Sequence, residues 1–141
     1  MTKRIVTVVL FLTVFLISAT PIKADPTKEQ KAVQQAADWL SLVDSGQYED
    51  SWDRAAAFFK NAVSKDQWLS SMNAYRKPLG KLIERTLQNN QYMTSLPGAP
   101  DGHYVVIQFH TAFENKKEAI ETVTPMLDSD GMWRVSGYFI K

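Results

Sequence analysis

The sequence contains no cysteine, and histidine and glycine are scarce, with two and six residues in a chain of 141. Without cysteine there is neither a disulfide framework nor the lipid-modified cysteine of a bacterial lipoprotein. The sequence contains neither of the glycine-rich phosphate-binding motifs, the P-loop and the dinucleotide-binding motif. The nucleophile motifs GxSxG and SxxK are also absent. Covalent catalysis and nucleotide chemistry therefore have no sequence signature here.

An excess of positive charge is also missing. The whole chain has a formal net charge of +1. If residues 1–24 are removed, Lys3, Arg4 and Lys23 leave with them, so that 13 of the 16 basic residues remain against all 15 acidic ones. Binding to nucleic acid needs a basic face that neutralises phosphates, so we expect no nucleic-acid partner.

The one long hydrophobic run stands at the N-terminus. Lys3 and Arg4 precede a predominantly apolar stretch from residue 5 to residue 19, and a small residue follows at Ala24. This order is typical of a secretory signal peptide, and the stretch is shorter than the roughly 20 residues of a membrane span. We predict cleavage after Ala24, with Ala19 as the alternative site, and a periplasmic or secreted protein that contacts the membrane only through an uncleaved signal.

The remaining residues, 25–141, are enough for a single domain with one core. Three amphipathic helices are predicted first, because apolar residues recur there at helical spacing. The first begins at Asp25 or Thr27 and ends near Ser45, the second begins near Tyr48, and the third runs from Ser64 to Pro78. The stripe of the second helix is Tyr48, Trp52, Ala55, Phe59 and Ala62.

The period then changes from 3.6 residues to two, which predicts strands. Strands are expected at residues 81–93, 103–114, 118–127 and 132–140, separated by turns and by the proline- and glycine-rich loop 94–102. In the second strand one side is almost purely apolar, and in the third Pro125 predicts a bulge. The fold class is therefore α+β, with three N-terminal helices packed on a curved four-stranded antiparallel meander that forms a half-open cone.

Four separated segments resemble one known family. They are WLSLVDSGQYEDSW from Trp39, RKPLG from Arg76, LPGAPDGHYVVIQF from Leu96 and DGMWRVSGYF from Asp130. Together they resemble the exported bacterial family called domain of unknown function four-zero-one-nine, over nearly all of the mature chain. The resemblance implies a cystatin-like, nuclear-transport-factor-2-like fold outside the cytoplasm, and it implies no established activity.

Six residues are candidates for a ligand site. Trp39 and Trp52 lie on apolar stripes and either pack in the core or line a pocket. Arg76, near a helix C-terminus, either ties the helix end to a carboxylate such as Glu84 or Glu121 or binds an anion. The other candidates are His110, Glu121 and Tyr138 on the strands.

No metal or cofactor is expected. His103 and His110 are seven positions apart, so in one regular strand they point to opposite faces and cannot hold one ion together. The turn that begins at Asp128 starts like a calcium loop, but Phe139 stands where the bidentate carboxylate is required. The turn therefore reads as an ordinary hairpin turn.

Two functions follow from these features. The first is a non-catalytic binding module that recognises a small apolar molecule, a peptide or a protein partner in the mouth of the cone, with no catalytic residues. The alternative is a small isomerase- or dehydratase-like enzyme, with His110 or Glu121 as base and Arg76 or Tyr138 as oxyanion donor. A homodimer formed through the open sheet face is also possible, because Tyr104, Val106 and Ala112 lie on the mixed side of the second strand.

Overall fold

The computed structural model describes residues 27–141 and consists of helices followed by a four-stranded sheet. The predicted signal peptide and its cleavage site lie outside the described residues. Among residues 27–141, no helix is long and apolar enough to cross a membrane. The α+β fold class predicted from the sequence is confirmed.

The helical part begins with the long helix α1, Lys28–Asp44. Its N-terminus has the predicted capping box, in which Thr27 and Gln30 bond to each other's backbone N–H groups. Three short helices follow, α2 at Tyr48–Asp53, α3 at Ala57–Ala62 and α4 at Lys65–Ser71. A π-helical segment, Met72–Arg76, and a 3-10 turn, Lys77–Leu79, lead into the sheet.

The second predicted helix is divided into α2 and α3. The break falls where the backbone N–H of Ala56 donates to the carbonyl oxygen of Val135 on β4, at 2.8 Å. Ala56 has an extended backbone conformation, with φ −61° and ψ 149°. This bond to the sheet edge replaces a helical bond, so a stripe that is continuous in the sequence is carried by two helices.

The sheet is an antiparallel meander in the order β1-β2-β3-β4. Its strands are β1 at Leu82–Met93, β2 at Tyr104–Phe113, β3 at Lys116–Leu127 and β4 at Trp133–Ile140. The ladder between β3 and β4 is irregular between Thr124 and Pro125, as the missing N–H of proline predicts.

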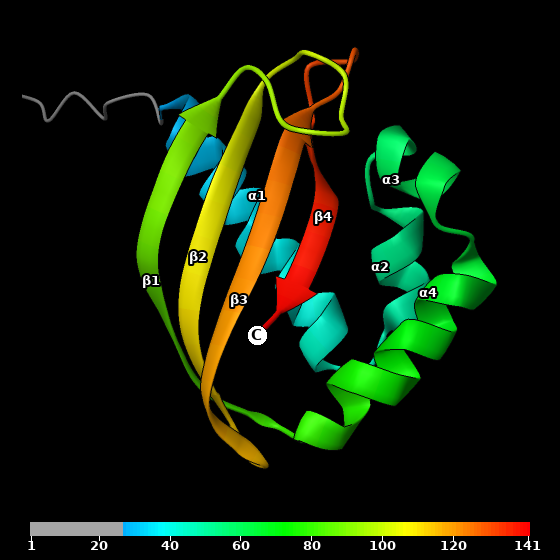
Figure 1. Ribbon diagram of the computed structural model, residues 1–141, viewed down its shortest axis with the longest axis vertical. Coiled ribbons are helices and arrows are strands. Elements are labelled where there is room, and N and C mark those ends of the chain that lie inside the picture. The colour runs from blue at the N-terminus through cyan, green and yellow to red at the C-terminus, as the bar shows by residue number, and fades with distance from the viewer. Residues whose placement is uncertain (1–26) are drawn as a thin grey trace, which may run out of the picture.

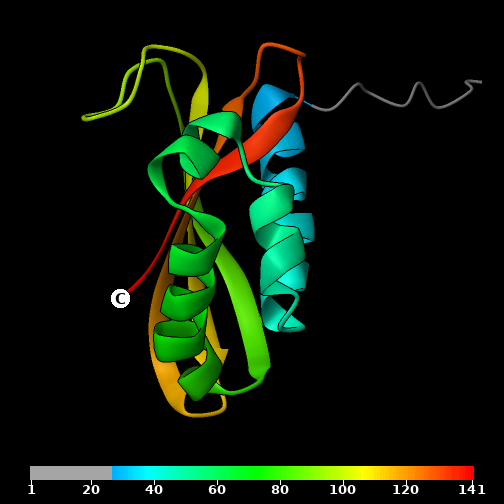
Figure 2. The same ribbon diagram turned by 90° about the vertical axis from the view of Figure 1, so that its right-hand side faces the viewer.

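One face of the sheet packs on the helices and the other is left open. In β2 the predicted apolar side is buried, and its members are Val105, Ile107, Phe109, Thr111 and Phe113. Figure 1 shows α1 behind the sheet, with the opposite face turned to the viewer and no helix in front of it. Figure 2, at right angles, shows α1 along one side of the sheet. The core therefore lies between the inner face and the helices, with α1 joined there by Phe59 of α3, Trp68 of α4 and Met72 of the π-helical segment.

Candidate functional site

A cluster of charged and hydroxyl side chains is buried between the helices and the sheet. It gathers one residue from the end of α1, one from the π-helical segment and one from each of the four strands. We call this cluster the core network; its members are Asp44, Arg76, Arg85, Thr111, Glu121 and Tyr138. The end of α1, the π-helical segment and all four strands are thus tied together through these side chains.

Glu121 lies at the centre of the core network and has no exposed surface. One carboxylate oxygen accepts bonds from Nε of Arg85 at 2.7 Å and from the hydroxyl of Thr111 at 2.6 Å. The other oxygen accepts a bond from the Tyr138 hydroxyl. Burial, followed by the negative charge of Glu121, raises the pKa of Tyr138 well above its usual value, so Tyr138 stays a neutral donor.

Asp44 joins the two arginines. Arg85 binds it with both terminal nitrogens, at 2.7 and 3.0 Å, while Nη2 of Arg76 lies 3.2 Å from it. Burial alone would lower the pKa of Arg85, but its bonds to Asp44 and Glu121 outweigh burial and raise that pKa. Two cations and two carboxylates therefore balance one another inside the fold.

Arg76 is held on three sides. Nη1 donates to the carbonyl oxygen of Gly80 at 2.7 Å, and the guanidinium lies 4.4 Å from the centre of the Phe113 ring. Only 2% of Arg76 is exposed. Its carboxylate partner is Asp44, whereas the sequence had suggested Glu84 or Glu121. Among residues 27–141, its Nε has no hydrogen-bond partner.

The two candidate tryptophans have different surroundings. Trp39 is buried, packs on the Tyr138 ring with centroids 5.3 Å apart, and donates its indole N–H to the backbone oxygen of Ser51 at 2.7 Å. Trp52 is half-buried, donates to the backbone oxygen of Val63 at 2.8 Å and lies beneath two lysine ammonium groups. Trp39 therefore adjoins the core network and Trp52 does not.

His110 is separated from the other candidates. It pairs across the sheet with Ile120, the neighbour of Glu121, so the side chains of His110 and Glu121 point to opposite faces. The imidazole contacts Glu118 at 2.6 Å, with 42% of the His110 side chain exposed. The structure thus brings Arg76, Glu121 and Tyr138 together and leaves His110 on the open face.

The sequence analysis missed Asp44 and Arg85. In the predicted first strand, Arg85 occupies the same alternating positions as Ile83 and Leu87. A charged residue among apolar ones in such a pattern indicates that its charge needs a partner. Asp44 ends α1, where the helix dipole disfavours a carboxylate, and such a residue calls for a cation from elsewhere in the fold. Both signals point to a buried ion pair, though neither identifies the partner.

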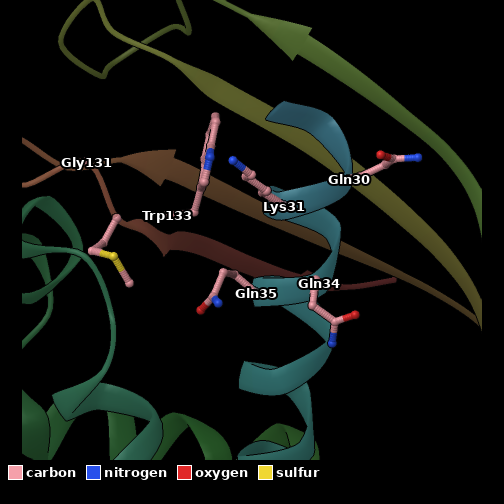
Figure 3. Close-up of a pocket in the computed structure, with 7 residues that line it drawn as sticks. Gln30, Lys31, Gln34, Gln35, Gly131 and Trp133 are labelled. Atoms are coloured by element: carbon pink, nitrogen blue, oxygen red, sulfur yellow. The ribbon is translucent and has the colours of Figure 1, made fainter. Parts of the chain in front are cut away.

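A groove runs along the outside of α1 beside the turn between β3 and β4. Its first hollow has a volume of about 570 Å³ and its second about 310 Å³. Gln35, Met132 and Trp133 line both hollows, which makes them continuous; we call them the α1 groove. Figure 3 shows Lys31 and Gln35 reaching from α1 toward the side of Trp133, while Gln30 and Gln34 point away.

Within residues 27–141, no three His, Asp or Glu side chains are grouped as metal ligands. A further hollow of about 410 Å³ lies at the C-terminal end of α1, where Asp44 and Arg76 of the core network line it together with Lys77 and Lys81.

The structure is similar to a solved protein from Catenulispora acidiphila. The two share a TM-score of 0.52 and 10% sequence identity, and the match covers 79% of this chain and 88% of the other. At this identity the likeness shows the fold alone. No curated protein sequence matches the chain significantly.

A family model described as "Protein of unknown function (DUF4019)" matches residues 35–138. The matched range begins within α1 and ends in β4, so it includes every member of the core network. The fold is also consistent with the cystatin-like, nuclear-transport-factor-2-like superfamily. The chain belongs to the DUF4019 family.

Proposed function

We propose that this protein is an exported, non-catalytic binding module that holds an extended peptide or a segment of a protein partner in the α1 groove. The observation that supports it best is the groove itself. Met132, half exposed at 51%, lies there beside Trp133, opposite Lys31 and Gln35 of α1. Aromatic and methionine side chains next to a few polar groups are typical of protein-binding surfaces.

The core network favours binding over catalysis. A general base must come within hydrogen-bond distance of the proton that it removes. Glu121 has no exposed surface, and its bonds already go to Arg85, Thr111 and Tyr138. In the alternative enzyme, Tyr138 would serve a substrate as oxyanion donor, whereas here it donates to the carboxylate itself.

The length of the α1 groove favours an extended ligand over a compact apolar one. Its lining on α1 runs from Gln30 to Leu42. Twelve residues of helix span about 18 Å, which corresponds to about five residues of extended peptide. Asp38 and Arg54 in the second hollow add charges of both signs, so a mixed-sequence peptide suits the groove better than a hydrocarbon.

The export part of the proposal rests on the charged head, apolar run and small residue at Ala24. Mass measurement of the protein recovered from the cell envelope or medium of its host tests it. We expect a chain that begins at Asp25, or at Thr20 if the alternative site is used. A full-length chain retained in the cytoplasm would contradict export without bearing on the α1 groove.

A displayed library of random peptides tests the binding part. The chain from residue 25 is immobilised, and enriched peptides are measured against Met132→Asp and against Tyr75→Asp. Tyr75 is 74% exposed in the π-helical segment and is absent from the lining of the α1 groove, so it is the matched control. We expect Met132→Asp to weaken binding by about tenfold or more and Tyr75→Asp to leave it unchanged. Absence of enrichment, or equal binding by both variants, would contradict the proposal.

A further inference from the structure

The hollow at the C-terminal end of α1 has no part in the proposed function. It has a volume of about 410 Å³ and shares no lining residue with the α1 groove; we call it the helix-end hollow. A volume of this size is within the range of small-molecule sites. The charged residues that line it are Asp44, Arg76, Lys77, Lys81 and Glu114.

The lining of the helix-end hollow has an excess of positive charge. Asp44 is already neutralised, because its oxygens accept bonds from both arginines of the core network. Lys77 and Lys81 are exposed and, among residues 27–141, form no ion pair. Glu114 is the other carboxylate of the lining. Outside the balanced core network, two cations therefore stand against one anion.

The negative end of the α1 dipole is offset at this place. The last carbonyl groups of α1 accept bonds from the backbone N–H groups of Ser45, Gly46 and Gln47, at 2.8 to 3.1 Å. Arg76 bonds to Asp44, the last residue of α1, and supplies the cation that a helix C-terminus favours. An anion in the hollow therefore meets capped carbonyl groups and a guanidinium.

Arg76 also has an unused hydrogen-bond donor. Its terminal nitrogens donate to Gly80 and Asp44, whereas its Nε is buried and, among residues 27–141, has no partner. Buried polar groups without a protein partner are normally satisfied by water or by another bound group. Because Arg76 lines the helix-end hollow, the oxygen of a ligand held there is the partner that we expect for this N–H.

Backbone bonds hold the walls of the hollow in place. The backbone N–H of Glu114 donates to the carbonyl oxygen of Lys81 at 2.8 Å. The backbone N–H of Asn115 donates to that of Leu79 at 2.9 Å. Between them lies Gly80, with a φ of +76°, where a Cβ would come within 2.9 Å of Glu114, so glycine is needed for this close approach. A preformed site of this kind loses little conformational entropy when it binds a ligand.

We propose that the helix-end hollow binds the carboxylate of a small organic acid or of a peptide C-terminus. Lys77 and Lys81 supply the cations that recognise the carboxylate, and Arg76 adds a fixed positive charge from the same lining. The excess of one positive charge suits a monoanion, whereas Glu114 disfavours a phosphate dianion. The inference does not depend on a peptide in the α1 groove, because no residue lines both sites.

Titration of the chain from residue 25 with sodium propionate tests the proposal, and propionamide is the neutral ligand of equal size. Proton–nitrogen correlation NMR follows the backbone amide of Gly80 and the Nε–H of Arg76, while sodium chloride keeps the ionic strength constant. We expect both signals to shift and saturate with propionate at millimolar affinity, since so small a ligand makes few contacts. Equal shifts with propionamide would overturn the proposal, because the charge would then not be recognised.

Substitutions identify the side chains that bind. Lys77→Gln combined with Lys81→Gln should weaken propionate binding by about tenfold or more. Lys28→Gln is the matched control, because Lys28 is exposed at the start of α1 and does not line the hollow. Glu114→Gln removes the nearby negative charge and should tighten binding. Circular dichroism confirms that each variant is folded, and equal affinity of the double variant and Lys28→Gln would sink the proposal.

Two further ligands distinguish the chemical sources. N-acetylalanylalanine carries a C-terminal carboxylate; if it binds more tightly than propionate, the site takes a chain end, and otherwise it takes a free acid. Inorganic phosphate that binds more tightly than both would overturn the choice of a carboxylate. Met132→Asp, which disrupts the α1 groove, should leave propionate binding unchanged, so failure of one proposal can be told from failure of the other.

Discussion

Two arginines in this protein each bind two carboxylates, one in the core network and one on the surface. Arg85 lies between Asp44 and Glu121 with 13% of its side chain exposed. Arg134 lies between Asp128 and Asp130, in and beside the turn from β3 to β4, with 33% exposed. The distances are alike, at 2.7 to 2.9 Å. Because the distances match, we expect burial, and not geometry, to decide how much each set of ion pairs contributes to the stability of the fold.

The two arginines also differ in the sequence separation from their carboxylate partners. Arg85 joins partners 41 and 36 positions away, whereas Arg134 joins partners six and four positions away. Arg85 therefore connects α1, β1 and β3, while Arg134 only closes a hairpin. Removal of Arg85 leaves two carboxylates in the protein interior without their main cation, and removal of Arg134 exposes two carboxylates to water.

The largest effect is expected from Arg85→Met. Because Glu121 has no exposed surface, the loss of its cation should lower the free energy of unfolding by about 3 to 5 kcal/mol. Urea unfolding followed by tryptophan fluorescence measures it, since Trp39 packs directly on Tyr138 in the network. Arg134→Met is the control of equal size change. A loss below about 1 kcal/mol in Arg85→Met would show that the buried and surface clusters are equivalent.

A smaller effect is expected from Tyr138→Phe, which removes one donor to Glu121 and keeps the ring. The unpaired oxygen should cost about 1 to 3 kcal/mol at neutral pH. Because the pKa of Tyr138 is raised in the folded state, its stabilising contribution is complete below the ordinary value near 10 and is lost as the pH rises above it.

The alkaline part of this prediction is checked by repeating the urea titration between about pH 8 and pH 11. The unchanged chain should lose stability faster than Tyr138→Phe above about pH 10, because the variant has no hydroxyl to ionise at this position. Parallel losses in the two proteins would mean that other tyrosines or lysines dominate, and that Tyr138 is not the neutral donor described here.

Local features of the fold could be predicted from the sequence, and long-range ones could not. Alternation along β2 gave the buried side correctly, and the boxes at Thr27 and Ser64 gave two helix starts, because each depends on neighbours in the chain. The break between α2 and α3 depends on a bond from Ala56 to Val135, 79 positions away, which no local pattern contains.

The candidate site shows the same limit. Arg76, Glu121 and Tyr138 were identified singly, from a helix end and from strand positions, but nothing local pairs them with one another. Their connection runs through Asp44 and Arg85, which stand in different elements. The α1 groove escaped prediction for a related reason, since its two walls are about a hundred residues apart in the chain.

The smallest effect on stability is expected from Arg134→Ala, although its local effect on ionisation should be plain. The bond from Arg134, followed by the backbone N–H of Met132, holds the pKa of Asp130 at about 2. Because this pKa is lowered in the folded state, any contribution to stability is present above the ordinary value of 3.8 and is lost as the pH falls toward 2. Asp130 is half exposed, so water and salt screen the pair and the contribution is small.

Carboxyl carbon shifts of Asp130, followed by NMR during an acid titration, should give a midpoint near 2 in the unchanged chain and a clearly higher one in Arg134→Ala. In 1 M NaCl the difference should shrink, because the Debye length falls to about 3 Å. An unfolding free energy that drops as far as in Tyr138→Phe would contradict the contrast between the surface and the interior, since the exposed cluster would then matter as much as a buried hydrogen bond.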